Sequence, residues 1–111
     1  MSGASSRRKG HSFEREIARL FRGLFPQARR GIQTRDGGGE AADVVIPFFH
    51  LELKRQIRCN IKAALRQAAE ECSAGKVPVA ICRDDYEAAT VTMRLDDFMD
   101  LVKEAKFKDL H

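Results

Sequence analysis

The chain has 111 residues, of which 43% are apolar and 32% charged, and its three cysteines show no C-x-x-C spacing. This composition is typical of one globular domain with reduced thiols and excludes a disordered chain, a disulfide framework or a zinc ribbon. No apolar run exceeds Val44–Phe49 and the N-terminus has no apolar signal segment, so we expect a cytoplasmic protein with no membrane partner.

The net charge of +4 is distributed unevenly along the chain. Residues 1–35 carry nine Lys or Arg and two acids, residues 36–53 carry four acids and no Lys or Arg, and residues 54–111 are nearly balanced. A basic segment followed by an acidic centre suits a protein that binds a polyanion and a cation. A globular domain with a basic tail explains the charge pattern equally well.

The charged and apolar residues of the sequence divide the chain into three segments. We expect residues 1–9 to form a disordered basic arm, residues 10–106 a single domain and residues 107–111 a C-terminal tail. A first helix is predicted from about Ser12, a candidate N-cap, to Phe25. The apolar residues that recur at helical spacing within it are Phe13, Ile17, Leu20, Phe21 and Leu24.

Strands follow this helix. Residues 27–32 predict a short strand, and residues 34–40, with three consecutive glycines, predict a flexible loop. Residues 43–46 are rich in β-branched side chains and residues 49–54 alternate with a period of two. Because Pro47 cannot continue a central strand, we expect a β-hairpin that turns at this residue.

The hairpin makes a geometric prediction about two acids. A two-residue or four-residue loop pairs Val44 with Leu51 and Asp43 with Glu52, whereas a three-residue or five-residue loop shifts the pairing by one. Directly opposed residues have Cβ atoms about 5 Å apart, so two carboxylates there repel each other. A cation is therefore expected beside them: Lys54, which lies diagonal to Asp43, or a divalent metal.

The second half of the chain alternates between helices and strands. Asn60 is a candidate N-cap for a helix that extends to Ala74. Residues 77–82 and 89–93 predict strands. Because the first of them contains Pro78, we expect this proline at the start of the strand or the strand at an edge of the sheet. A last helix over residues 95–106 is expected to turn Leu95, Phe98, Met99, Val102 and Ala105 inward. The predicted order is α-β-β-β-α-β-β-α, an α/β sandwich in which helices flank a central mixed sheet.

Asp43 and Glu52 are candidate ligands of Mg²⁺, a hard cation that takes protein carboxylates, water and phosphate oxygens. Lys54, one strand period beyond Glu52, could orient an attacking water or stabilise developing charge. Glu14, on the flank of the first helix, could complete the site. An Asp-Glu-Lys cluster on a solvent-facing sheet is the alternative, and His50 on the same face is left out of the catalytic set.

Several motifs together resemble a known family. R-K-G at residues 8–10, E-R-E at residues 14–16, arginines before a glycine-containing loop, Asp43 and E-L-K at residues 52–54 occur in that order. This set is similar to the archaeal-type Holliday-junction resolvases of the PD-(D/E)XK nuclease superfamily, which has a restriction-endonuclease-like fold. Small proteins of this kind also occur in bacteriophages.

The resemblance implies roles for individual residues. Glu14, Asp43 and Glu52 would match the metal-binding acids and Lys54 the catalytic lysine, while Gln67 resembles a glutamine that several branches carry on the helix after E-x-K. The residues that we expect to contact DNA are Arg7, Arg8, Lys9, Arg30, Thr34, Arg35 and Arg55.

The resemblance also implies a function. It describes an endonuclease that uses Mg²⁺, with Mn²⁺ as a substitute, to resolve branched double-stranded DNA as a homodimer during recombination and repair. Such a protein would act in the cytoplasm of a bacterium or of a phage-infected cell. Two alternatives stay open: the same chemistry on nicked, flapped, damaged or linear DNA, and a DNA-binding module without catalysis.

Overall fold

The computed structural model describes residues 3–32 and 39–105, which form three helices and a five-stranded mixed sheet with the strand order β1-β2-β3-β4-β5. The elements are α1 (Gly3–Arg22), β1 (Arg29–Arg30), β2 (Val44–Val45), β3 (Phe49–Gln56), α2 (Ile61–Glu71), β4 (Val77–Asp84), β5 (Thr90–Thr92) and α3 (Leu95–Ala105). The predicted α/β class and element order are confirmed. Thr34 and Arg35 fall within residues 33–38 and lie outside the described residues.

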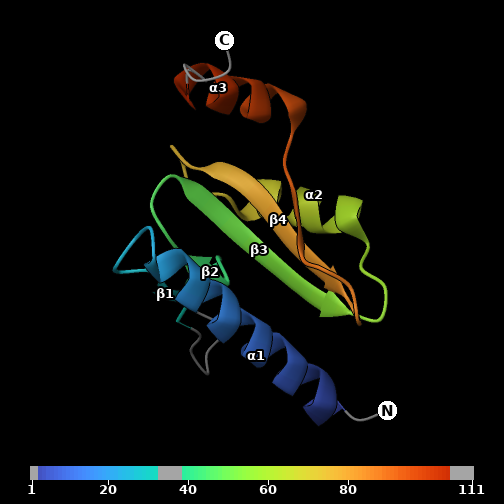
Figure 1. Ribbon diagram of the computed structural model, residues 1–111. Helices are drawn as coiled ribbons and strands as arrows, with labels where there is room; N and C mark the ends of the chain where they lie inside the picture. The colour runs from blue at the N-terminus through green and yellow to red at the C-terminus, as the bar shows by residue number, and fades with distance from the viewer. Residues whose placement is uncertain (1–2, 33–38, 106–111) are drawn as a thin grey trace.

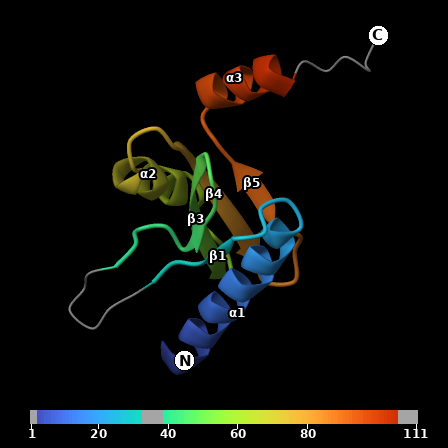
Figure 2. The ribbon, with the colours of Figure 1, turned by 90° about the vertical axis from the view of Figure 1, so that its left-hand side faces the viewer.

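Helices α1 and α2 cover opposite faces of the sheet (Figure 1, Figure 2). On the α1 side, Phe13 and Ile17 pack with Leu51 and Leu53 of β3 in the main hydrophobic core. Leu51 is fully buried, and burying an aliphatic side chain of this size contributes about 1.5–3 kcal/mol. This apolar face fixes which side of β3 is turned toward α1.

The opposite face of β3 carries the polar residues, since side chains alternate along a strand. Glu52 and Lys54 therefore lie on the α2 side. There α2 contributes Ala64 to a small core with Ala80 and Cys82 of β4. Because these side chains are small, α2 lies close to the sheet and buries the polar residues beneath it.

The ends of α2 and the start of β4 follow local sequence rules. The side-chain oxygen of Asn60 accepts a 3.0 Å hydrogen bond from the backbone N–H of Ala63, which confirms the predicted N-cap. The helix ends at Glu71, before the predicted Ala74. Pro78 is the second residue of β4, as expected of a strand start, but β4 lies inside the sheet between β3 and β5.

The predicted hairpin register is confirmed. Val44 pairs with Leu51 and Val45 with His50 in the antiparallel ladder between β2 and β3. Phe48 closes the turn in a left-handed conformation with a φ of 71°. The next position along the ladder brings the two acidic residues of the hairpin side by side.

The N-terminal segment differs from its prediction. We expected a disordered arm over residues 1–9, but α1 begins at Gly3 instead of Ser12 and continues without a break to Arg22. The side chain of Lys9 donates a 2.8 Å hydrogen bond to Asp85, which ties this part of the helix to the end of β4. The sequence pattern missed this long-range contact because Met1 and Ala4 are the only apolar residues of the segment and form no helical stripe.

Two leucines predicted for the core of α1 are exposed. Leu20 and Leu24 are 63% and 75% exposed. Buried and half-buried apolar residues of α1 centre on Ile17 and Phe21, so Leu20 falls on the flank of this stripe, and Leu24 lies beyond the end of the helix.

Helix α3 does not bury its apolar face. It stands apart from the sheet (Figure 1, Figure 2), and none of its residues is buried. The inward orientation predicted for Leu95, Phe98, Met99, Val102 and Ala105 is therefore wrong: periodicity predicts an apolar stripe, and it does not predict what covers it. No helix in the described part of the chain is long and apolar enough to cross a membrane.

Gly31 generates a stability prediction. A Cβ atom at this residue would lie 2.0 Å from the backbone oxygen of Ala42, and the Gly31 N–H donates a 2.9 Å hydrogen bond to the backbone oxygen of Asp43. Because backbone cannot move aside as a side chain can, we expect Gly31→Ala to lower the free energy of unfolding by about 1–3 kcal/mol. Urea denaturation measures this change.

Gly10 supplies the matched control. It lies within α1, and a Cβ atom there would meet nothing within 4 Å. Gly10→Ala should raise the free energy of unfolding by up to about 1 kcal/mol, since alanine favours a helix over glycine. Equal urea midpoints for wild type and Gly31→Ala would contradict the close approach of the two strands.

Candidate functional site

A cavity of about 400 Å³ lies where the edge of the sheet meets both helices. Strand β2 is only two residues long, so it leaves the far part of β3 without a neighbour on that side. Five predicted site residues line this cavity: Glu14, Arg30, Asp43, Glu52 and Gln67. Glu71 is among the lining residues that the sequence analysis did not select.

Asp43 and Glu52 form the centre of this site. Asp43 extends β2 by one step, and its carboxylate accepts a 2.9 Å hydrogen bond from the backbone N–H of Leu53. Glu52 is 3% exposed and interacts directly with Asp43 through their side chains. Its Oε2 lies 3.5 Å from Nζ of Lys54, and no described residue bonds to its Oε1. The prediction that the two acids meet across the hairpin is confirmed.

Burial changes the protonation of both acids. It raises the pKa of Glu52 to about 8, with a further increase from the charge of Asp43, and Lys54 only partly opposes these effects. Burial likewise raises the pKa of Asp43, although its bond with Leu53 works in the opposite direction. Without a cation the pair therefore retains a proton near neutral pH, and a bound cation would favour the fully charged form.

Glu14 occupies the cavity wall but is already paired. Its Oε1 accepts a hydrogen bond from Nε of Arg30 at 3.1 Å and is equally close to the Arg30 Nη2 atom. A predicted metal ligand is thus bonded to a predicted DNA-binding residue. In the described part of the chain, neither Glu14 nor Asp43 belongs to the group of three residues whose potential ligand atoms lie within 4.8 Å of one another.

Two residues that the sequence analysis left out of the site are His50 and Glu71. Within the described ranges, His50, Glu52 and Glu71 are the group of three that brings potential ligand atoms within 4.8 Å of one another. Gln67 donates a 3.3 Å hydrogen bond to Glu71. The spacing held a signal: His50 is two residues before Glu52 on the same strand face, and Glu71 is one helical turn after Gln67.

The base of the adjacent loop is fixed by an ion pair. Arg29 donates to both carboxylate oxygens of Glu40, at 2.6 and 2.8 Å, and the backbone N–H of Ile32 donates to the same carboxylate at 2.9 Å. The bonds from Arg29 and Ile32 lower the pKa of Glu40 to about 2. These bonds join the two sides of the loop beside the cavity.

Several predicted DNA-binding residues lie at the other end of α1. Lys9 and Arg55 both bond to Asp85, and with Arg8 they line a second cavity of about 370 Å³. Arg7 is exposed. These basic side chains lie where β3 and β4 end.

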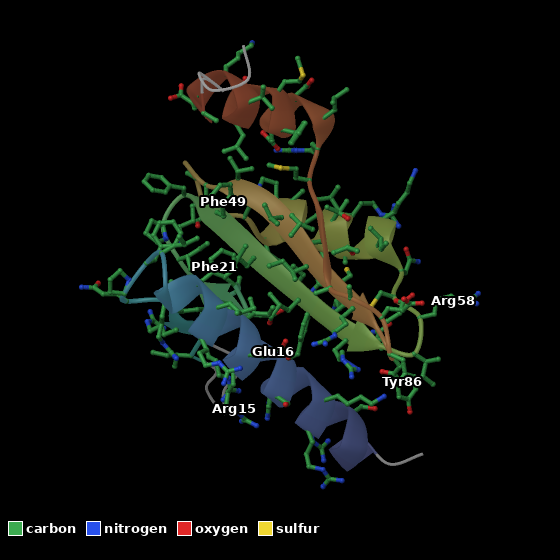
Figure 3. All side chains as sticks on the ribbon, viewed as in Figure 1. Arg15, Glu16, Phe21, Phe49, Arg58 and Tyr86 are labelled. Carbon is green, nitrogen blue, oxygen red and sulfur yellow. The ribbon has the colours of Figure 1, made fainter. Side chains whose placement is uncertain are left out.

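Helix α1 is fixed to that end of the sheet by a further ion pair. Figure 3 shows Glu16 on the side of α1 that faces the sheet, where Arg83 of β4 lies 3.0 Å from both of its carboxylate oxygens. The contact aligns the basic first half of α1 with the strand ends. The basic residues therefore occupy a defined surface and not a separate arm.

The donor set fits Mg²⁺. Asp43 and Glu52 offer carboxylate oxygens, the ligands that hard divalent cations prefer, and the Oε1 atom of Glu52 is buried without a bond to any described residue. An unpaired buried carboxylate oxygen is costly unless a proton or a cation compensates for it. Both residues thus have the chemistry of a cation site.

The raised pKa of Glu52 predicts a pH-dependent stability. Between its ordinary pKa near 4.5 and about 8 the folded protein binds more protons at Glu52 than the unfolded chain, so stability falls as pH rises. In EDTA at pH 8 we expect the free energy of unfolding of Glu52→Gln to exceed that of wild type by about 4 kcal/mol. The stability of this variant should decline little between pH 5 and pH 8.

The control for that measurement is Glu70→Gln, an exposed residue of α2. It should follow the wild-type pH profile, because its exposed side chain does not line the Asp43–Glu52 cavity. A wild-type stability that rises between pH 5 and 8 in EDTA would contradict a protonated Glu52.

Comparison with protein-family models finds no match for this chain. The same holds for comparison with curated proteins and with solved structures. The resemblance of its motifs to junction resolvases therefore stays a prediction.

Proposed function

We propose that this protein is a metal-dependent DNA endonuclease that hydrolyses phosphodiester bonds at the Asp43–Glu52 cavity. The observation that carries the proposal is the pair of interacting carboxyl groups with Lys54 beside them. Two acids forced together in a buried site cost stability. A cation bound by both acids would offset this cost and would account for the arrangement.

Asp43 and Glu52 would bind Mg²⁺, or Mn²⁺ in its place. The ion, when bound, would lower the pKa of a coordinated water and offset negative charge on the phosphate. Lys54 is half-buried and directed at Glu52, so its ammonium group could orient the attacking water or stabilise the charge that develops on the phosphate oxygens. In this proposal Asp43 and Glu52 bind the cation, and Lys54 positions the nucleophile.

Arg30 suits the role of a phosphate-binding residue. Its guanidinium group is partly exposed on the cavity wall and bonds to Glu14. A DNA phosphate could replace Glu14 as the partner of Arg30, since guanidinium groups bind phosphate oxygens in a bidentate manner. Glu14 would then be released toward the cation, directly or through a water.

DNA is the proposed substrate because of the basic residues of α1 and the strand ends, which line a second cavity, whereas the charged residues that line the Asp43–Glu52 cavity itself are mainly acids. The net charge is +4, and the exposed Arg7 and Arg8 extend the basic surface along α1. Such a surface binds the phosphate backbone without reading sequence. The finer proposal, four-way junctions cut by a homodimer, rests on the motif resemblance.

The catalytic role of Asp43 predicts a separation of binding from cleavage. Asp43→Asn preserves the hydrogen bond from Leu53 but removes a charge from the cation site, so we expect cleavage in Mg²⁺ to fall by at least about 100-fold. Binding of a labelled junction, measured by mobility shift in Ca²⁺, should stay within about twofold of wild type. Asp96→Asn, on the exposed surface of α3, is the matched control.

Substrate choice is tested by comparing a synthetic four-way junction with linear duplexes of the same sequence, in Mg²⁺ and in Mn²⁺. Paired nicks on opposed strands of the junction alone would support resolution. Equal cutting of the duplexes would contradict it and favour the other DNA substrates. Full cleavage activity of Asp43→Asn, or no cleavage of any DNA by the wild type, would overturn the endonuclease.

A further inference from the structure

Two buried polar side chains lie next to each other on the α2 side of β3. His50 and Glu52 are 2% and 3% exposed, and the Nε2 atom of His50 and the Oε1 atom of Glu52 have no hydrogen-bond partner among the described residues. An unpaired buried imidazole nitrogen or carboxylate oxygen is costly, so each such atom calls for an explanation.

The neighbouring strand offers these atoms no side-chain partner. In the parallel ladder His50 lies beside Pro78, and Glu52 lies beside Ala80. Neither side chain carries a hydrogen-bonding atom, and the backbone polar groups of the ladder serve the sheet. Asp43 and Lys54 interact with the Glu52 carboxylate, but the His50 Nε2 and Glu52 Oε1 atoms still have no hydrogen-bond partner among the described residues, and α2 is the element that covers this face.

Glu71 is the group that approaches from α2. It is the last residue of the helix, and one of its carboxylate oxygens accepts the bond from Gln67. Potential ligand atoms of His50, Glu52 and Glu71 all lie within 4.8 Å of one another. That separation suits three ligands around one ion, since ligand atoms about 2.0–2.2 Å from a zinc ion lie about 3–4 Å apart.

We propose that His50, Glu52 and Glu71 form a binding site for a first-row transition-metal dication such as Zn²⁺ or Mn²⁺. Glu71 lines the same cavity as Asp43, and Glu52 contributes to both sets of ligands. An imidazole nitrogen distinguishes the two, because it suits transition metals, whereas Mg²⁺ takes oxygen ligands. Exposed Glu71 leaves the ion an entry path from solvent.

Burial lowers the pKa of the His50 imidazole, the charge of Lys76 lowers it further, and Glu71 and Asp43 oppose both effects. This site requires metal binding alone and would exist whether or not the chain cleaves DNA.

The test is a Zn²⁺ titration of the full chain in excess Mg²⁺, followed by calorimetry and by ¹⁵N NMR of the imidazole groups. We expect one Zn²⁺ per chain and a shift of the His50 Nε2 resonance on binding. Glu71→Gln should weaken the affinity by at least about tenfold, since it removes one of three ligands at the surface without disturbing the core. Glu70→Gln, its exposed neighbour, should bind as wild type does.

Two further variants separate this inference from the proposed endonuclease. His50→Asn should lose the site, and Glu71→Gln keeps the test decisive if the buried substitution prevents folding. Asp43→Asn should still bind Zn²⁺ even where it abolishes DNA cleavage. An unchanged His50 Nε2 resonance at saturating Zn²⁺, or wild-type Zn²⁺ affinity in Glu71→Gln, would overturn the site.

Discussion

The structure depends on two carboxyl groups that the hairpin register forces together. Asp43 and Glu52 cannot move apart without shifting β2 against β3, and a shift of one residue would turn Leu51 out of the main core. The burial of the hairpin's apolar face therefore holds Asp43 and Glu52 together on its polar face although their carboxylates repel each other. Burial of Leu51 and its neighbours supplies the free energy that keeps the acids in place.

Neighbouring residues make this pairing possible in different ways. Gly31 lets the backbone approach Ala42 closely, and its bond to the Asp43 carbonyl fixes the strand that carries this acid. The alanines of α2 and β4 permit a short helix-to-sheet distance, which removes Glu52 from water. The same small side chains offer no hydrogen bond to the buried His50 Nε2 and Glu52 Oε1 atoms, which a proton or a cation would compensate.

The sequence predicted the features that depend on residues close together in the chain. It did not predict the features that depend on contacts between distant segments. Period-two alternation around Pro47 was enough to place Asp43 opposite Glu52, and Asn60 was enough to start α2, because strand faces and N-caps involve residues close in sequence. Helix α3 has the apolar stripe that its periodicity predicts, but none of its residues is buried. The bond of Lys9 to Asp85 and that of Glu14 to Arg30 join distant segments, and no spacing rule predicts them.

Glu52 determines how the two cation proposals relate to each other. It is the one residue common to the Asp43 pair and to the His50–Glu71 group. Its Oε2 atom lies near Lys54, and its Oε1 atom has no hydrogen-bond partner among the described residues. If both proposed sites bind cations, the first ion would displace the proton that burial retains on Glu52. A second ion would then meet an ionised carboxylate but also the charge of the first ion. The balance of these two effects would decide whether the two proposed sites cooperate or compete.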